Sequence, residues 1–107
     1  MSTDDPIELS KAFKALSNPN RLKLFFNLIR ETEMDVEAGH SGSCFLAPLM
    51  RNLNVGAPTV SHHVKELVNA GLIHTERRGK QLVCSINSAM VDRLRRAFDM
   101  PSGSPQS

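Results

Sequence analysis

The segment Gly56–Asn87, GAPTVSHHVKELVNAGLIHTERRGKQLVCSIN, decides the fold of this 107-residue chain. Residues 57–70 have helical periodicity, and Gly71 follows as a left-handed cap that ends the helix. Two strand-like stretches, Leu72–Arg78 and Gln81–Asn87, flank a turn that contains a glycine. A helix of this size fits the major groove of DNA, and a basic hairpin after it can lie along the phosphate backbone. The order of elements therefore predicts a DNA-reading winged helix.

The predicted helix has an apolar side and a polar outer side. Val60, Val64 and Leu67 form the apolar stripe, and at about 100° per residue the polar side chains lie opposite it. Hydroxyl and imidazole groups can bond base edges or phosphates, whereas lysine offers charge to the backbone. The alternative is a merely solvated surface. The predicted DNA-binding residues of helix and hairpin are Thr59, Ser61, His62, His63, Lys65, Arg77, Arg78 and Lys80.

His63 has a competing interpretation. It lies nearer the apolar stripe than its neighbour His62, so a semi-buried structural role, bonded to a neighbouring helix, is the stronger expectation for it. Consecutive residues of a helix point in different directions, so the two histidines are not expected to share one metal ion.

The residues just upstream supply the other half of a helix-turn-helix. A short helix is expected to begin near Ala47, because Pro48 deeper inside a helix would cost a backbone hydrogen bond. Its buried side would consist of Leu49, Met50 and Leu53. A tight turn at Asn54–Gly56 then leads into the helix at 57–70, which is the helix-turn-helix pattern.

Two further helices are predicted near the N-terminus. Asp4–Pro6 resemble a helix start, and the helical pattern continues to about Ser17. Asn18 is a capping residue, and Pro19 suits the first position of a second helix. The apolar stripe of this second helix, expected to be central to the core, consists of Leu22, Phe25, Phe26 and Ile29. Residues 31–43, polar and acidic with two glycines, are predicted to form a loop.

A last helix completes the expected architecture. Asn87 or Ser88 can cap it, and its apolar side would consist of Val91, Leu94 and Phe98. Residues 101–107, PSGSPQS, have the composition of a disordered tail, which leaves residues 1–100 as one winged helix-turn-helix domain. The predicted fold class is mainly α with a small β-hairpin (α+β), with five helices and a two-stranded wing.

Charge is distributed unevenly along the chain. The net charge is +2, but residues 1–40 hold five Lys/Arg against seven Asp/Glu, while residues 41–107 hold eight against four. The basic part includes the helix and hairpin, as expected of a nucleic-acid face. No apolar run approaches membrane-spanning length and the N-terminus is acidic, so a cytoplasmic location without membrane contact is expected. The two cysteines are expected to be thiols there.

Three stretches together resemble the ArsR/SmtB family of small winged-helix transcriptional repressors. They are ALSNPNRLKLFFNLI at 15–29, PTVSHHVKELVNAGLI at 58–73 and RRGKQLVCSIN at 77–87, and the likeness spans roughly residues 10–98. The resemblance implies a homodimer built through the first and last helices. It also implies binding to a palindromic double-stranded DNA operator, repression of a nearby operon, and release of DNA when an inducer binds.

The inducer site is where the sequence departs from the family. The metal-sensing branch places a Cys-x-Cys pair before the helix that precedes the recognition helix, and those positions are Phe45 and Ala47 here. Cys44 is adjacent but out of register. Another branch uses Asp and His ligands on the last helix, but SAMVDRLRRAFDM contains no histidine. The usual ligands are missing, so no cofactor is expected and the inducing signal is unidentified.

Cys44 leaves two other kinds of regulation open. His40 and Cys44 are weak candidate ligands for a soft metal, since two ligands do not make a site. Cys44 is also a candidate for thiol-redox sensing. Cys84 alternates with Leu82 and Ile86 on one strand face, so it is expected to point inward as a small buried hydrophobe.

Two other functional classes compete with a DNA-binding regulator. One is a winged-helix protein-interaction module, against which the basic hairpin and the lack of a large apolar patch on the outer helix face both argue. The other is an enzyme, and we expect none because the nearby Cys–His pair has no visible oxyanion or phosphate cradle.

Overall fold

The computed structural model describes residues 5–40, 42–46 and 56–99. The helices are α1 (Pro6–Ala15), α2 (Pro19–Glu37), α4 (Ala57–Asn69) and α5 (Ser88–Arg96), and the strands are β1 (Ser43–Phe45), β2 (Ile73–Arg78) and β3 (Gln81–Ile86). The described part of the chain is thus α+β with four helices. The short helix predicted from about Ala47 and the tail predicted at 101–107 lie outside the described residues.

The predicted helix starts are confirmed by their caps. Asp5, Asn18 and Asn87 accept hydrogen bonds of 3.0, 3.0 and 3.3 Å from backbone N–H groups in the first turns of α1, α2 and α5. These side chains satisfy donors that a helix leaves without internal partners. Just after the C-terminal end of α4, Gly71 has φ +76°, a conformation that a residue with a Cβ adopts only with strain. Local sequence therefore sets these helix boundaries.

The sheet has three antiparallel strands in the order β1-β3-β2. The predicted two-stranded wing corresponds to β2 and β3, which agree with the predicted strands to within one residue at each end. Strand β1 was not predicted: Ser43 was placed at the end of the loop predicted at 31–43, which is wrong, and no element was predicted for Cys44 and Phe45. Three residues are too few for alternation to indicate a strand, and β1 exists because it pairs with the free edge of β3.

Helix α2 is longer than predicted, because residues 31–37 are helical rather than part of a loop. Glutamate and methionine, which make up much of this stretch, are good helix formers whatever their polarity. The chain then turns back tightly at Gly42, whose N–H donates to Asp35 Oδ2 at 2.7 Å. Gly42 has φ +90°, and a Cβ there would approach a methyl of Val36 to 3.1 Å. Only glycine fits this return easily.

The core lies between α2, α4 and the base of the sheet. Its largest fully buried side chains are Leu24 and Leu28 of α2, Val60 and Leu67 of α4, and Leu72, Ile73 and Cys84. The inward position predicted for Cys84 is confirmed. Burial of large aliphatic side chains is the main favourable term in the folding of such a domain, so these residues fix α4 against the rest of the molecule.

Two aromatic residues predicted for the core are exposed. Phe26 is 58% exposed while Phe25 is buried, because neighbours on a helix point about 100° apart and only one of them can face the core. Phe98 is 69% exposed, since α5 ends at Arg96 and the residue lies beyond the helix. Its ring instead contacts that of Phe13 of α1, edge to face, at a centroid distance of 5.5 Å.

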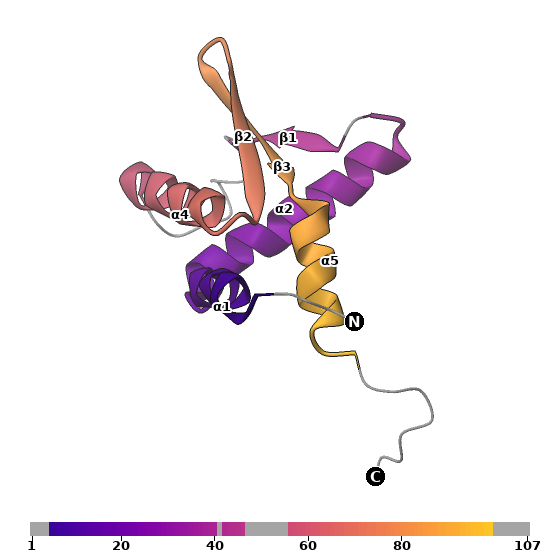
Figure 1. The fold of residues 1–107 in the computed structure, drawn as a ribbon. Helices are drawn as coiled ribbons and strands as arrows, with labels where there is room; N and C mark the ends of the chain where they lie inside the picture. Colours follow the sequence, from indigo (N-terminus) through magenta and orange to yellow (C-terminus); the bar gives the residue numbers. More distant parts are fainter. Residues whose placement is uncertain (1–4, 41, 47–55, 100–107) are drawn as a thin grey trace.

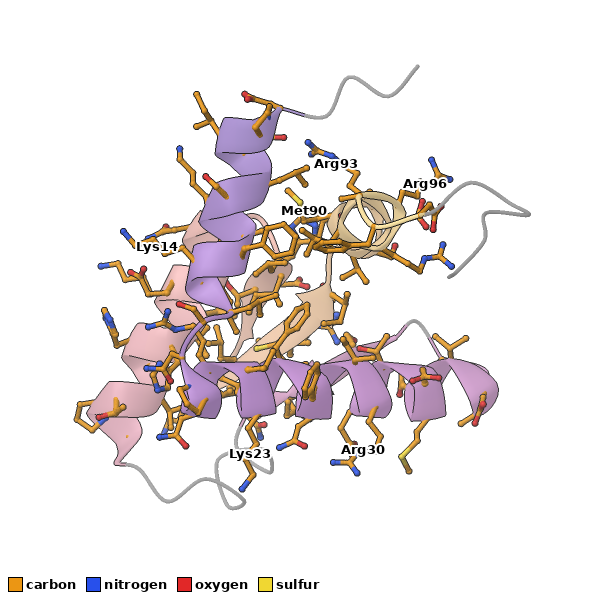
Figure 2. All side chains as sticks on the ribbon, turned by 90° about the horizontal axis from the view of Figure 1, so that it is seen from below. Lys14, Lys23, Arg30, Met90, Arg93 and Arg96 are labelled. Atoms are coloured by element: carbon orange, nitrogen blue, oxygen red, sulfur yellow. The ribbon has the colours of Figure 1, made fainter. Side chains whose placement is uncertain are left out.

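The elements divide into two ends of the molecule. Figure 1 shows the β2–β3 hairpin projecting beyond the helices, with α4 beside its base. Helices α1 and α5 lie side by side at the other end, and Figure 2 shows Arg93 of α5 on the side toward α1. Arg93 forms an ion pair of 2.5 Å with Glu8 of α1. The wing therefore takes no part in these contacts between α1 and α5.

Candidate nucleic-acid interface

Helix α4 presents the predicted polar face to solvent. Thr59, Ser61, His62 and Lys65 are all exposed, whereas the apolar stripe on the opposite side is buried. The buried stripe packs the inner side of α4 against the core, so the outer side of α4 is free to contact a ligand. Hydroxyl, imidazole and ammonium groups on one helical face can contact base edges and phosphates in a major groove.

The wing brings three further cations to solvent. Arg77, Arg78 and Lys80 are exposed around the turn at Gly79, which joins β2 to β3. Arg78 pairs with Glu76 at 3.4 Å, but both side chains are more than half exposed. Such surface pairs contribute little free energy, so the guanidinium can exchange this partner for a phosphate oxygen.

His63 is placed apart from the rest of the predicted set. It is 4% exposed, and its Nδ1 accepts a hydrogen bond of 3.3 Å from Nε of Arg21 in α2. Because it is buried against α2, it has no surface to offer to a base, and we remove it from the DNA-binding residues. The structural interpretation, a histidine bonded to a neighbouring helix, is the one that the geometry supports.

Arg21 is a residue of this region that sequence reasoning missed. Its guanidinium also donates to the carbonyl oxygen of Ala15 at 3.0 Å, so one side chain joins the end of α1, the start of α2 and His63 of α4. The only sequence signal is an arginine in the first turn of α2, where a solvated side chain is the ordinary expectation. Its role follows from the packing of α4 on α2.

Burial lowers the pKa of His63, and the positive charges of Arg21 and His62 lower it further. The neutral imidazole is thus the form that the fold accommodates. As pH falls below about 6.5, the ordinary value, the unfolded chain binds a proton that the folded chain does not. We therefore expect the free energy of unfolding to decrease from that pH down through the folded pKa of His63. Urea denaturation between about pH 5 and about pH 8 measures this.

Two variants separate His63 from other titrating groups. His63→Gln should lose much of the decrease below about pH 6.5, whereas His62→Gln, at the exposed neighbouring position, should keep it. Equal pH dependence in the wild type and in His63→Gln would show that the buried imidazole is not the group responsible.

Asn87 connects the end of α4 to α5. Its side-chain Nδ2 donates to the carbonyl oxygen of Gly71 at 2.8 Å, and its backbone N–H donates to that of Leu72 at 2.9 Å. The end of α4 and the start of α5 are thus held by one residue, which also caps α5. The position of the end of α4 is therefore linked to the start of α5.

The weak metal candidates, His40 and Cys44, line one hollow of about 570 Å³ beside the end of α2. Burial, together with the nearby carboxylates of Glu31 and Asp35, raises the pKa of the Cys44 thiol to about 11. A metal ligand must be a thiolate, which this environment disfavours. Within residues 5–40, 42–46 and 56–99, no group of three or more His, Cys, Asp or Glu could hold a metal ion.

A helix with an exposed polar face, followed by a projecting basic hairpin, defines a winged-helix DNA-binding regulator. No helix in the described ranges has the length and apolar character needed to cross a membrane. Comparison with known proteins agrees with this class. Residues 40–75 match the family described as "Bacterial regulatory protein, arsR family".

Relatives and a solved structure extend the likeness over most of the chain. The arsenical resistance operon repressor of Staphylococcus xylosus is 29% identical over 99 residues, 92% of this chain and 85% of the relative. The repressor of the same description from Staphylococcus aureus is 30% identical over 87 residues, 81% and 73% of the two chains. A homodimeric winged helix-turn-helix DNA-binding domain of Mycobacterium bovis matches with a TM-score of 0.64 at 16% identity, over 91% and 86%.

The chain belongs to the ArsR family. It is a DNA-binding transcriptional regulator of the ArsR type, as the resemblance had implied. The structural likeness at 16% identity supports the winged-helix fold and nothing finer.

Proposed function

We propose that the protein is a dimeric repressor that binds a palindromic operator and leaves it in response to a signal. The observation that carries the proposal is the division of α4 into a fully buried inner stripe and an exposed outer face, next to a projecting basic wing. Repression itself is supported by the relatives, which are described as operon repressors.

In this proposal α4 enters the major groove and the wing follows the adjacent backbone. Ser61 and His62 have the groups to bond base edges, while Lys65 and the cations of the wing contact phosphates. Two protomers related by a two-fold axis would place their α4 helices on half-sites about 34–36 Å apart. The operator would therefore be a palindrome with half-sites about one helical turn apart.

The dimer would form through α1 and α5, together with Phe98 just after α5. Ile7 of α1 is 67% exposed, and Phe98 is exposed to a similar degree beside Phe13. Large apolar side chains gathered at one end of a small domain favour burial against a second copy. The wing lies away from this end, so dimer formation leaves both wings free for DNA (Figure 1).

The salt dependence of DNA binding tests the phosphate contacts. A duplex is first selected from random-sequence DNA with the purified protein, and its affinity is measured against salt concentration. Lys65→Ala and Arg77→Ala should each weaken binding and lower the slope of log K against log salt by about 0.9, the change for one lost phosphate contact.

Lys23→Ala is the matched control, because Lys23 is also exposed but belongs to α2 rather than to α4 or the wing. Its slope should equal that of the wild type. If the slopes of Lys65→Ala and Arg77→Ala also match the wild type, the surface formed by α4 and the wing does not carry the DNA contact. Failure to select any duplex at low salt would favour a protein partner instead.

A further inference from the structure

The sheet places Cys44 and Cys84 directly opposite each other. They lie far apart in the sequence, but the antiparallel register of β1 and β3 pairs Cys44 with Cys84, between the pairs Ser43–Ser85 and Phe45–Val83. Both thiols are free. The chain contains two cysteines, and the fold brings them together.

This pairing is compatible with a disulfide. Directly opposite residues of antiparallel strands have Cα atoms about 4.5 or about 5.5 Å apart, and their side chains project to the same face. Disulfides join Cα atoms about 4.4–6.8 Å apart, so both spacings lie within range. A bond between the two sulfurs therefore requires local adjustment of side chains rather than a new arrangement of strands.

The two thiols differ in access. Cys44 is half-buried and lines the hollow of about 570 Å³ whose walls include Glu31, His40 and Arg78. Cys84, in β3, is fully buried. A small solute in the hollow can therefore reach Cys44, whereas Cys84 has no exposed surface and does not line the hollow. This is the arrangement of an attacking thiol with a resolving thiol behind it.

We propose that peroxide oxidises Cys44 and Cys84 to a reversible disulfide, and that this bond changes the affinity of the protein for DNA. Deprotonated Cys44 Sγ attacks one oxygen of the peroxide, the O–O bond breaks, and the other oxygen leaves as water or alcohol after protonation. Cys84 Sγ then attacks the sulfur of the Cys44 sulfenic acid. The S–O bond breaks, the S–S bond forms, and the hydroxyl leaves as water with the proton of Cys84. Two thiols are oxidised and the peroxide is reduced.

The surroundings of the pair set a high threshold for this reaction. Burial raises the pKa of Cys84 to about 11, as burial and nearby carboxylates do for Cys44. The charged and titratable groups around the hollow are Glu31 and Asp35 of α2, His40 after it and Arg78 of the wing. Thiolate is therefore scarce near neutral pH and increases as pH rises. The pair should ignore brief exposure to oxidant and respond to sustained exposure.

The position of Cys84 links such a bond to DNA binding. Cys84 pairs with Cys44 on one side and with Thr75 of β2 on the other, so it lies at the base of the wing. A disulfide would tie the wing through β1 to the end of α2. The consequence for DNA rests on the proposed function, whereas formation of the bond does not.

The bond itself is tested on the full chain by hydrogen peroxide at about pH 8.5, followed by alkylation, intact mass and peptide mapping without reductant. We expect a mass decrease of about 2 Da, for two hydrogens, and one cross-linked peptide pair that dithiothreitol separates. Cys44→Ser and Cys84→Ser should each abolish the cross-link. Cys84→Ala is a second variant, because a buried serine hydroxyl can impair folding. Circular dichroism shows which variants fold.

Three outcomes would overturn the proposal: unmodified thiols after prolonged exposure, sulfinic acid on Cys44 with Cys84 still a thiol, or bonds that join two chains. Affinity for the selected duplex, compared between oxidised and reduced protein, tests the consequence. A change of threefold or more, absent in Cys44→Ser, is expected. A disulfide with unchanged affinity refutes the regulatory role, and it leaves the DNA-binding function intact if the reduced protein binds.

Discussion

Leu67→Ala is expected to lower the free energy of unfolding by about 2–5 kcal/mol. Leu67 is fully buried in the stripe of α4, beside Val60 and Val64. Alanine would remove apolar burial and leave a cavity that a close-packed core fills only in part. Small domains have a total stability of about 5–15 kcal/mol, so the variant would lose a large share of it. Urea denaturation of wild type and variant measures the difference from the two midpoints.

Val68→Ala is the matched control on the same helix. Val68 is exposed, so its truncation removes little burial and should change the free energy of unfolding by less than about 1 kcal/mol. If Leu67→Ala and Val68→Ala lowered the free energy of unfolding equally, the assignment of the inner and outer sides of α4 would be wrong. A loss confined to Leu67→Ala would place the polar side of the helix toward solvent, as the DNA-binding role requires.

Much of the fold could be predicted because its signals are local. The caps at Asn18 and Asn87, the glycine stop at Gly71 and the wing turn are chosen within a few residues of where they act. The buried stripe of α4 follows from helical spacing alone. The exposed candidate DNA-binding residues follow from the same spacing, since the face opposite a buried stripe has to be exposed.

The rest depends on partners distant in the chain. Strand β1 exists through its pairing with β3, which no pattern within three residues can indicate. The hydrogen bond from Arg21 to His63 joins residues separated by 42 positions, so local spacing could not identify the partner of the buried histidine. Phe25 and Phe26 are the same type of residue but differ in exposure. The rotation of α2 relative to the core decides which of the two rings is buried. Such features follow from tertiary packing rather than propensity.

The contrast between local sequence and tertiary packing also applies to the candidate sensor residues. Sequence reasoning treated Cys44 as a candidate sensor and Cys84 as a core residue, because each was judged from its own neighbourhood. The register makes Cys44 and Cys84 one pair, while their raised pKa values leave little of the thiolate that a metal ion needs as a ligand near neutral pH. The structure thus shifts attention from a metal at His40 and Cys44 to the bond between two strands.

Ile7→Asp and Phe98→Asp are expected to convert the protein to a monomer and to weaken binding to a palindromic duplex by about a hundredfold or more. Both side chains are largely exposed, so the substitutions cost little in the isolated fold. In the proposed dimer each would bury an unpaired carboxylate, which is strongly unfavourable. A monomer would also lose the gain in affinity from two linked half-sites. Analytical ultracentrifugation gives the oligomeric state, and a gel-shift titration gives the affinity.

Phe26→Asp separates this effect from a general loss of exposed aromatic surface. Phe26 is also largely exposed, and helical spacing places it on the same side of α2 as Lys23 and Arg30, which Figure 2 shows pointing away from α1 and α5. It should keep the size and affinity of the wild type. Dimers that persist in Ile7→Asp and Phe98→Asp would place the interface elsewhere on the surface. Monomers that still bind the palindrome with wild-type affinity would instead show that one protomer suffices, because the linked half-sites would then contribute nothing.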